Sequence, residues 1–440
     1  MDRSTTPLPQ PVFSEPVFNE GSFTPDPSHE SVPHPSDAEL YRELGNSLLK
    51  NIVSFAPSRL KDDEIFSVAE AFGGRGPDVV AAIKKAGRAS FHVIGDSGAS
   101  SDGKYQHELH VADQLTADFH ASPVASRPTF LYSLGDVVYD FGEAQYYYDQ
   151  FYEPYRNYPA PIFAIPGNHD SFIVPGTAPD NEPLKVFSRN FCAQQHEITA
   201  EAASLHRTAM TQPGVYFSLD LPFARIIGLF SNALENPGLI SDQNGRWPGV
   251  PRYQLGFLEA QLARIKTEAY AGAVLLAMHH PPFTYQPATG NKTGSHVGST
   301  DMLREIDRIC AKVRVYPHAV LSGHAHNYQR YTRVVQRGAE QYDVPFVVCG
   351  CGGHNVNPLA GVRQEPAFGA RVDHLDPKPA LPTGGLTLEK YDDRNYGYLK
   401  ITVDQKKLQI AFHQVNEVSL TQSRFDLVNI DLATHRKVAN

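Results

Sequence analysis

Between residues 90 and 330, five short apolar runs each end in a small polar cluster. The clusters read GDSG, GDVVYD, GNHD, HHPPF and GHAHNYQR, and they begin at residues 95, 135, 167, 279 and 323. The runs look like strands, and helical stretches such as residues 256–271 separate them, which predicts an α/β domain. Function usually sits where the strands of such a domain end, so this repeated pattern predicts one site built from several loops.

The composition limits the partners and the setting of the chain. A formal net charge of −9 argues against a nucleic-acid partner or an anionic membrane, since neither favours an acidic protein surface. No apolar run approaches the ~18 residues of a spanning helix, and the N-terminus lacks the charged-then-apolar pattern of a signal peptide. We expect a cytoplasmic setting by default, with a secreted or periplasmic location and the oligomeric state left open.

The chain is expected to have three parts. Residues 1–38 are rich in Pro, Ser and acidic side chains and have no periodicity, which predicts a disordered segment. Apolar spacing predicts helices over residues 38–56, 62–72 and 77–87, so residues 39–88 are interpreted as a helical extension. Residues 89–440 are interpreted as the domain that carries the site, and they end in further expected strands.

Taken alone, each cluster has an ordinary structural interpretation. Asp96 could cap the next helix, and Asp136 could turn a loop beside a core tyrosine. His279 and His280 point to opposite sides of an extended backbone, so only one of them is expected to face a site. Each of these signals is therefore weak when it stands by itself.

The cluster GHAH carries the strongest single signal. His324 and His326 are two residues apart, so an extended backbone places both imidazoles on one face, whereas a helix separates them by about 200°. Together the clusters supply seven oxygen or nitrogen donors and no thiolate, enough for a two-metal centre with a bridging carboxylate. Two-metal centres are the usual machinery for hydrolysing phosphate esters. The candidate ligands are Asp96, Asp136, Tyr139, Asn168, His279, His324 and His326.

The ordered clusters GDSG, GDVVY, GNHD, AMHH and GHAH resemble the five signature blocks of purple acid phosphatases, within the calcineurin-like metallophosphoesterases. Those blocks read G-D-x-G, G-D-x-x-Y, G-N-H-[DE], V-x-x-H and G-H-x-H. The resemblance covers roughly residues 90–420, and its one departure inside a block is Leu276 in place of valine. It implies a four-layer α/β/β/α sandwich of two mixed sheets flanked by helices. Plant members carry a β-sandwich domain before the catalytic one, which the expected helices of residues 39–88 do not match.

The resemblance also implies which residues hold which metal ion. Asp96, Tyr139 and His326 would bind Fe(III). A divalent iron, zinc or manganese ion would be held by Asn168, His279 and His324, and Asp136 would bridge.

Tyr139 is expected to take the place of a histidine that the first cluster lacks. Most related phosphoesterases have Asp-x-His in the first block, whereas this chain has Asp96-Ser97-Gly98. Tyr139 would replace that histidine as a phenolate, a hard anionic donor that suits Fe(III). A trivalent and a divalent ion, against two carboxylates and one phenolate, leave a net positive site that attracts a phosphate anion.

The expected activity is an acid phosphatase that hydrolyses small phosphomonoesters by attack of a metal-bound hydroxide. His169 is the first candidate to contact the phosphate or protonate the leaving alkoxide, and His296 is the second. His280 and His354 are expected to be structural, with a supporting role beside the ligands as the alternative. A phosphodiesterase or nucleotide-pyrophosphate hydrolase, a non-catalytic phosphate-binding protein and a purely structural α/β protein are the competing interpretations.

Overall fold

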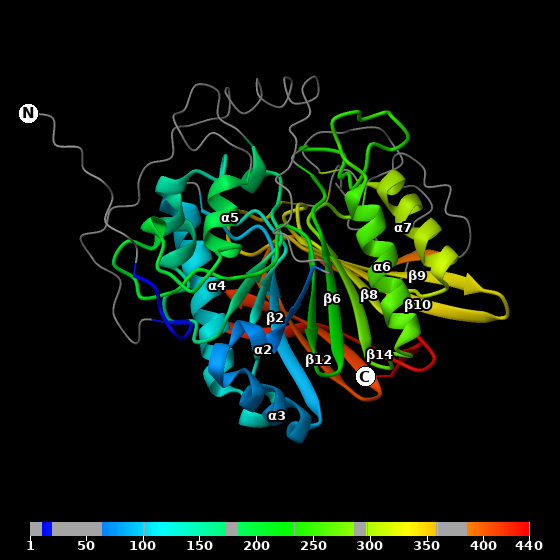
Figure 1. Ribbon diagram of the computed structural model, residues 1–440, viewed down its shortest axis with the longest axis horizontal. Helices are drawn as coiled ribbons and strands as arrows, with labels where there is room; N and C mark the ends of the chain where they lie inside the picture. Colours follow the sequence, from blue (N-terminus) through cyan, green and yellow to red (C-terminus); the bar gives the residue numbers. More distant parts are fainter. Residues whose placement is uncertain are drawn as a thin grey trace, which may run out of the picture.

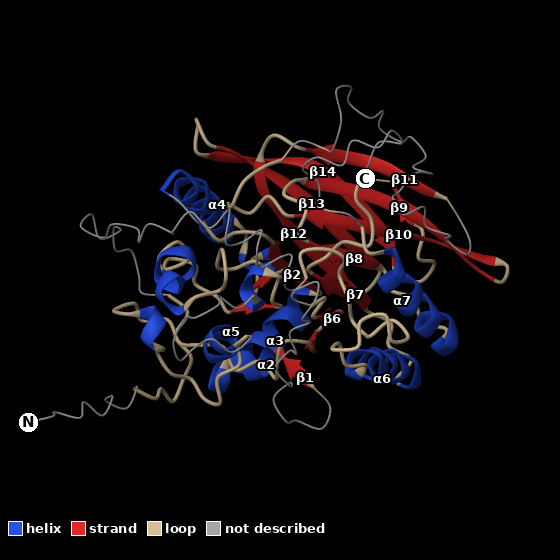
Figure 2. Cartoon of the chain, turned by 90° about the horizontal axis from the view of Figure 1, so that it is seen from above, coloured by secondary structure: helices blue, strands red, loops and turns tan. Residues whose placement is uncertain are grey.

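The computed structural model describes residues 11–19, 64–99, 102–172, 184–232, 234–285, 296, 298–357, 359 and 385–439. Two mixed β-sheets lie at the centre of the fold, and helices pack against them (Figure 1, Figure 2). This architecture confirms the predicted fold class of two mixed sheets flanked by helices.

The larger sheet has eight strands in the order β1-β5-β6-β7-β8-β10-β9-β11. Its central strands β6, β7, β8 and β10 run parallel to one another, and β9 and β11 complete one edge in antiparallel pairing. The strands are β1 (Ile65–Ser67), β5 (Phe217–Leu221), β6 (Ala224–Leu229), β7 (Ala273–Met278), β8 (Ala319–Ser322), β9 (Tyr328–Arg337), β10 (Glu340–Cys349) and β11 (Leu386–Asp392).

The smaller sheet has seven strands in the order β15-β14-β13-β12-β2-β3-β4. Strands β2, β3 and β4 are parallel, and the strands from β12 to β15 form antiparallel pairs. The strands are β2 (Arg88–Ile94), β3 (Leu131–Ser133), β4 (Ile162–Ala164), β12 (Tyr396–Asp404), β13 (Lys407–Asn416), β14 (Thr421–Asp431) and β15 (Lys437–Val438).

The helices pack on both sheets. Helix α4 contacts β12 and β13, α3 contacts β2, and α6 contacts both β6 and α7. Figure 1 shows α6 and α7 side by side along the larger sheet. The helices are α2 (Val68–Ala71), α3 (Gly76–Ala86), α4 (Asp102–Ala121), α5 (Lys185–Phe191), α6 (Tyr253–Thr267) and α7 (Thr300–Val313).

The apolar runs of the sequence became strands because both faces of the central strands are covered. Every residue of β7 is buried, as a parallel strand inside a layered fold requires. Between the sheets, Tyr132 of β3 lies 6.3 Å from Phe217 of β5, and Tyr328 of β9 stacks 3.9 Å from Phe412 of β13, measured between ring centroids. The core therefore lies between the two sheets.

One helix was expected where the structure has a strand. Residues 65–67, inside the expected helix 62–72, form β1 and pair in parallel with β5. Ser67 and Glu70 form a capping box that starts the four-residue helix α2 only after the strand. Phe66 is buried against Phe163, which a strand position makes possible. The expected helix 77–87 is confirmed as α3, and the one over 38–56 lies outside the described residues.

Part of the segment expected to be disordered is ordered. Residues 11–19 run along the folded chain, where Val12 pairs with Glu197 and Phe18 packs edge-on against Phe72 at 5.2 Å. The prediction of disorder is wrong for these nine residues because Phe18 finds a buried partner far along the chain. The other residues of 1–38 lie outside the described ones, and the three-part division of the chain stays a prediction.

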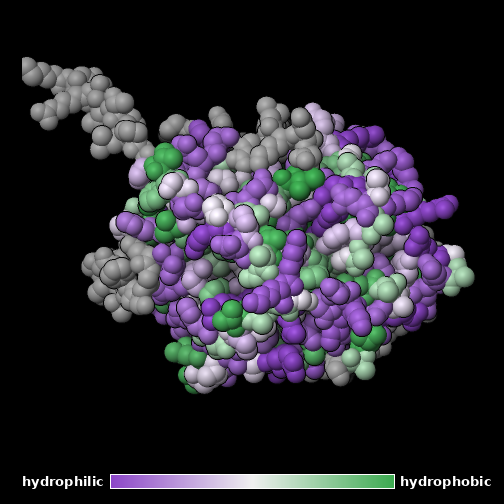
Figure 3. All heavy atoms as spheres, turned by 60° about the horizontal axis from the view of Figure 1, so that its bottom comes forward, coloured by the Kyte–Doolittle hydropathy of each residue, from purple (hydrophilic) through white to green (hydrophobic). Residues whose placement is uncertain are grey.

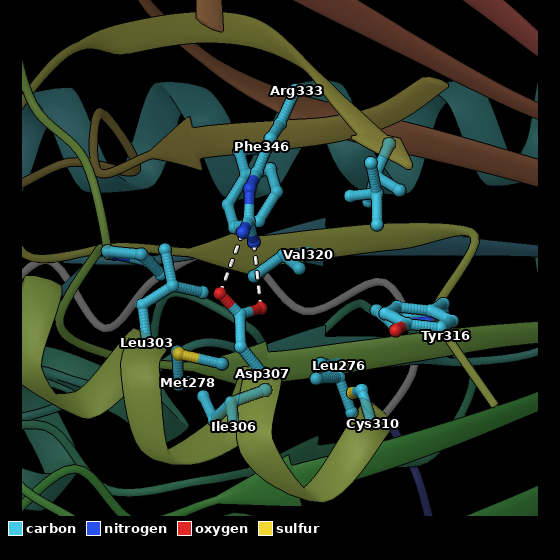
Figure 4. Close-up of a pocket in the computed structure, with 14 residues that line it drawn as sticks. Leu276, Met278, Leu303, Ile306, Asp307, Cys310, Tyr316, Val320, Arg333 and Phe346 are labelled. Atoms are coloured by element: carbon cyan, nitrogen blue, oxygen red, sulfur yellow. Dashed lines mark hydrogen bonds and ion pairs between the residues drawn. The ribbon is translucent and has the colours of Figure 1, made fainter. Parts of the chain in front are cut away.

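A partly buried ion pair ties α7 to the larger sheet. Arg333 of β9 donates to both carboxylate oxygens of Asp307 at 2.7 and 2.9 Å, and Figure 4 shows the pair with apolar side chains such as Leu303 and Phe346 beside it. The cavity beside it measures only about 20 Å³ and is lined by residues such as Leu303 and Phe346. The pair and its apolar surroundings therefore hold α7, which follows His296 in the chain.

The surface is mainly hydrophilic on the face that Figure 3 shows, with small apolar patches between polar side chains. Among the helices of the described ranges, none is long and apolar enough to cross a membrane.

The buried His318 makes the stability of this fold depend on pH. Its Nδ1 accepts from the Val274 N–H and its Nε2 donates to the Leu432 carbonyl, and burial lowers its pKa to about 4. The unfolded state then binds the proton more tightly, so this contribution is complete above pH 6.5 and is lost as pH falls towards 4. We expect about 2 kcal/mol less stability at pH 5 from this residue.

Denaturant unfolding at pH 7 and pH 5 measures the effect. The variant His318→Gln should lose less stability between the two pH values than the wild type, because glutamine can keep both hydrogen bonds without titrating. His120→Gln, at an exposed position of α4, is the control and should keep the wild-type pH dependence. Equal pH dependence in wild type and His318→Gln would contradict the assignment.

Candidate metal centre

The five polar clusters lie where strands of both sheets end. GDSG, GDVVYD and GNHD follow β2, β3 and β4 of the smaller sheet, while the HHPPF and GHAHNYQR clusters follow β7 and β8 of the larger one. Backbone hydrogen bonds join the loops directly, from Asp96 N to Gly135 O at 3.0 Å and from Gly323 N to His279 O at 2.9 Å. The N–H of His324, after β8, donates to Asp96 Oδ2, after β2, at 2.8 Å, so the carboxyl ends of the two sheets meet at one site.

Three of the predicted ligands have a left-handed backbone. Asp96, Asp136 and His324 have φ angles of 56°, 54° and 66°, and each directly follows a glycine. This conformation costs a non-glycine residue about 1–3 kcal/mol and is found mainly where function requires it. The turn after each strand is thus shaped so that the side chain points into the site.

Glycines let the loops close on the carboxylates. A Cβ on Gly167 would lie 2.0 Å from Asp136 Oδ1, and a Cβ on Gly323 would lie 2.5 Å from Asp96 Oδ2. Neither distance is possible for a real side chain. The glycines of GNHD and GHAH are therefore required by close approach to the two acidic groups.

Gly98 stands where most related phosphoesterases have a histidine, and the structure shows why a side chain does not fit there. A Cβ at this position would lie 2.4 Å from the Val137 carbonyl oxygen and 2.8 Å from Gln150 Oε1. The loop that carries Tyr139 occupies that space, and the side chain of Gln150 holds it through the N–H of Tyr139 at 2.8 Å. Position 98 therefore has no room for a side chain while Tyr139 is in place.

One group of donors gathers around the tyrosine. Tyr139 Oη lies 3.4 Å from Asp96 Oδ1 and 3.4 Å from His326 Nε2. His326 Nε2 is also 3.4 Å from Asp96 Oδ1. These three atoms form a triangle with equal edges, and all three side chains are buried.

A second group gathers around Asn168. Its Oδ1 lies 2.9 Å from His279 Nε2 and 3.0 Å from His324 Nδ1. His279 is oriented by its other nitrogen, because Nδ1 donates to the Leu134 carbonyl at 2.9 Å. Its Nε2 is thereby directed at the site.

Asp136 lies between the two groups. Its Oδ2 is 3.0 Å from Tyr139 Oη and 3.2 Å from His279 Nε2, and its Oδ1 accepts the N–H of His169 at 2.9 Å. Ligands about 2.1 Å from an octahedral ion lie about 3.0 Å apart, so these spacings suit two neighbouring ions that share Asp136. The structure thus brings all seven predicted ligands together, while their role as ligands remains a prediction.

The electrostatics of the site also fit cations. Asp96 and Asp136 are buried, and burial, which lowers the pKa of His279, is outweighed by these two carboxylates, which raise it to about 9. Burial, and then the negative charge of Asp136, raise the pKa of Tyr139 well above its usual value. The donor set therefore demands positive charge from outside its own side chains.

The two candidate catalytic histidines lie at the rim of this cluster. His169 Nδ1 donates to the Asp140 carbonyl at 2.8 Å, and its Nε2 is 4.0 Å from Asp136 Oδ2. The ring of His296 lies 4.1 Å from that of His324, between centroids. Their positions beside the cluster are compatible with the predicted roles, which stay predictions.

The two histidines expected to be structural differ from each other. His280 has its nitrogens 2.8 Å from Ser231 Oγ and 2.7 Å from the Leu234 carbonyl, and its ring centroid lies 4.2 Å from that of His324, with planes at 43°. His354 instead stacks on the ring of Tyr139, with centroids 3.6 Å apart and planes at 12°. Both rings therefore lie beside a predicted ligand, and that of His354 is the one stacked nearly parallel to its neighbour.

Sequence reasoning missed Glu235, in the loop after β6. Its Oε2 accepts from Asn168 Nδ2 at 2.9 Å, which turns Asn168 Oδ1 towards the histidines. Its Oε1 lies 3.3 Å from His296 Nδ1. The signal was present, because the run ending at Leu229 is also a strand followed by polar residues, but the cluster SNALEN contains no recognisable ligand motif.

Comparisons with known proteins identify one family and several solved structures that the chain resembles. The pattern of the calcineurin-like phosphoesterase family matches residues 89–328. Solved structures that resemble the chain include GAP50, the anchor in the inner membrane complex of Plasmodium, with 11% identity, a TM-score of 0.45, and coverage of 77% of this chain and 88% of that one. PhoD has 13% identity and a TM-score of 0.46 over 80% of this chain and 72% of that one. No curated protein matches significantly.

Replacing Gly167 with alanine should displace the carboxylate of Asp136. The added Cβ would overlap Asp136 Oδ1 and its backbone N, so we expect Gly167→Ala to lose most bound metal while the sheets stay folded. Metal content by mass spectrometry, with circular dichroism of the same samples, measures both. Gly256→Ala in α6 is the matched control, since its Cβ meets nothing within 4 Å. Full metal content in Gly167→Ala would contradict the geometry.

Proposed function

The chain belongs to the calcineurin-like phosphoesterase family, and from this premise we propose that it hydrolyses phosphomonoesters at a centre of two metal ions. The family supplies the reaction class, which is hydrolysis of a phosphoester. The monoester preference and the binuclear iron-containing centre are our own extension of it.

The convergence of two donor groups on Asp136 carries the proposal. Asp96, Tyr139 and His326 would hold one ion, and Asp136, whose Oδ2 lies 3.0 Å from Tyr139 Oη and 3.2 Å from His279 Nε2, would be shared by both ions. The other ion would be held by Asn168, His279 and His324. Bound cations would offset the cost of burying the carboxylates of Asp96 and Asp136 at one site.

We propose Fe(III) for the ion beside Tyr139 and a divalent iron, zinc or manganese for the other. Tyrosine in place of a histidine favours a hard trivalent ion, because only a highly charged cation readily takes the proton's place on a buried phenol. The seven donors contain no thiolate, which agrees with this choice.

The metal ions, when bound, would activate water and polarise the phosphate group. The chain's own side chains would do the rest. His169 Nε2 faces the cluster at 4.0 Å from Asp136 Oδ2, where it can hydrogen-bond the phosphate or hold the proton that the leaving alkoxide takes. His296, oriented by Glu235, would contact the substrate from the opposite group of ligands.

The competing functions differ in what they require. A phosphodiesterase or nucleotide-pyrophosphate hydrolase could use the same ligands, so the choice depends on the surroundings of the site. A non-catalytic phosphate-binding protein would not need all seven donors, yet this chain keeps every one at the cluster. We therefore place the monoesterase first and the diesterase second.

An assay of metal-loaded protein on a phosphomonoester, a phosphodiester, a nucleoside triphosphate and a cyclic nucleotide between pH 4 and 8 tests the proposal. We expect the monoester to have the highest kcat/KM. Asp136→Asn should lose activity and metal together, whereas His169→Ala should lose activity by about 10²-fold or more and keep its metals.

The outcomes separate the alternatives. A higher kcat/KM for a diester or pyrophosphate substrate than for the monoester would favour the phosphodiesterase or pyrophosphate hydrolase over the monoesterase. Metal-loaded protein inactive on all four substrates would leave only the non-catalytic interpretation, and wild-type turnover in His169→Ala would remove that residue from the chemistry.

The proposed iron–tyrosine contact predicts a coloured protein. A phenolate bound to Fe(III) gives a broad visible charge-transfer band, so the concentrated iron-loaded protein should absorb in the visible range and Tyr139→Phe should not. Iron content measured on both samples is the control. A colourless, iron-loaded and active wild type would remove Tyr139 from the metal but leave the hydrolase reaction standing.

A further inference from the structure

Two imidazoles flank the ring of Tyr139. The His354 ring lies almost parallel to it, with centroids 3.6 Å apart and planes at 12°, and His169 contacts it at 4.1 Å and 36°. The His354 side chain is 6% exposed, and Tyr139 is fully buried. The tyrosine ring is therefore held from its faces, and not only at its hydroxyl group.

The hydrogen bonds of His354 fix its tautomer. Nδ1 lies 2.9 Å from the carbonyl oxygen of Gly98, which can only accept, so Nδ1 carries the proton. Nε2 lies 2.8 Å from Lys104 Nζ, an ammonium that can only donate, so Nε2 is the acceptor. The backbone N–H of His354 donates to the Asp96 carbonyl at 3.0 Å, which anchors the loop after β10 to the first cluster.

These contacts join three elements around the tyrosine. Lys104 comes from α4, Gly98 from the loop after β2, and His354 from the loop after β10. The Lys104 ammonium draws electron density from the imidazole through Nε2, which makes the ring electron-poor on the face that meets Tyr139. An electron-poor ring stacks favourably on an electron-rich phenol, and more so on a phenolate.

We propose that Lys104 and His354 are positioning residues for Tyr139, which hold the plane of its ring and set the energy of its donor electrons towards the metal. This inference rests on the proposed iron–tyrosine contact. The stack fixes the ring so that Oη stays 3.0 Å from Asp136 Oδ2 and 3.4 Å from Asp96 Oδ1. The charge of Lys104, relayed to the face of the ring, stabilises electrons on the phenolate.

The colour of the protein reports this interaction directly. Charge transfer moves an electron from the phenolate to Fe(III), so a positive charge beside the phenolate raises the transition energy. Removing that charge should move the band to longer wavelength. Lys104→Met is therefore expected to shift the absorption maximum to the red, whereas Lys104→Arg, which keeps a charged donor, should stay near the wild-type position.

A second variant separates the ring from the charge. His354→Phe keeps an aromatic ring on Tyr139 but has no nitrogen to accept from Lys104, so it should also shift the band to the red. His318→Phe is the matched control, because His318 is another buried, stacked histidine at the opposite end of β8. Its absorption maximum should not move.

The experiment records visible spectra and iron content of the iron-loaded wild type, the four variants and Tyr139→Phe. Unmoved bands in Lys104→Met and His354→Phe, with full iron and a normal wild-type band, would overturn this inference alone. A wild type without the band, or a band that survives in Tyr139→Phe, would overturn the iron–tyrosine contact and this inference with it. If His354→Phe does not fold, the spectrum of Lys104→Met tests the inference by itself. The Lys104 side chain is only half-buried on α4, so its replacement should not prevent folding.

Discussion

The structure depends on the burial of one carboxylate, that of Asp136. It is 1% exposed, its two oxygens contact the phenol of Tyr139, the imidazole of His279 and the backbone of His169, and its own backbone is left-handed. A buried anion is unfavourable unless positive charge or hydrogen-bond donors surround it. The loops after β3, β4 and β7 supply donors on each side, and Gly167 has no side chain because the carboxylate fills that space. The order of strands in both sheets brings these loops to one point.

The central strands could be predicted because their burial requires an apolar pattern that is visible within each short run of the sequence. Runs such as Ala273–Met278 are apolar at every position, and a strand buried on both faces requires that pattern. The expected helix over residues 62–72 was wrong because Ile65–Ser67 is stabilised by pairing with β5, about 150 residues away in the chain. The order around Phe18 could not be predicted for the same reason. Its burial depends on contact with Phe72, which the composition of residues 11–19 does not reveal.

The ligand set could be predicted further than its surroundings. Each candidate ligand follows an expected strand and carries a donor atom that metal ions bind. The sequence therefore predicted that these seven residues form one site. Glu235 and His354 are different, because neither stands in a recognisable motif and each acts on a residue in another loop. Glu235 orients the amide of Asn168, and His354 covers the ring of Tyr139. Such contacts tune a site through side-chain orientation, and orientation depends on the folded chain.

Gly98 connects the missing histidine to the presence of the tyrosine. A side chain at this position would collide with the Val137 carbonyl. The loop that carries Tyr139 can therefore adopt this conformation only if residue 98 is glycine. The carbonyl of the same residue accepts the proton of His354 Nδ1, and His354 in turn lies on the tyrosine ring. One glycine thus makes room for the loop and also anchors the stack on Tyr139. An exchange of donor at such a site involves more than one residue, because the space, the loop and the stacked ring depend on one another.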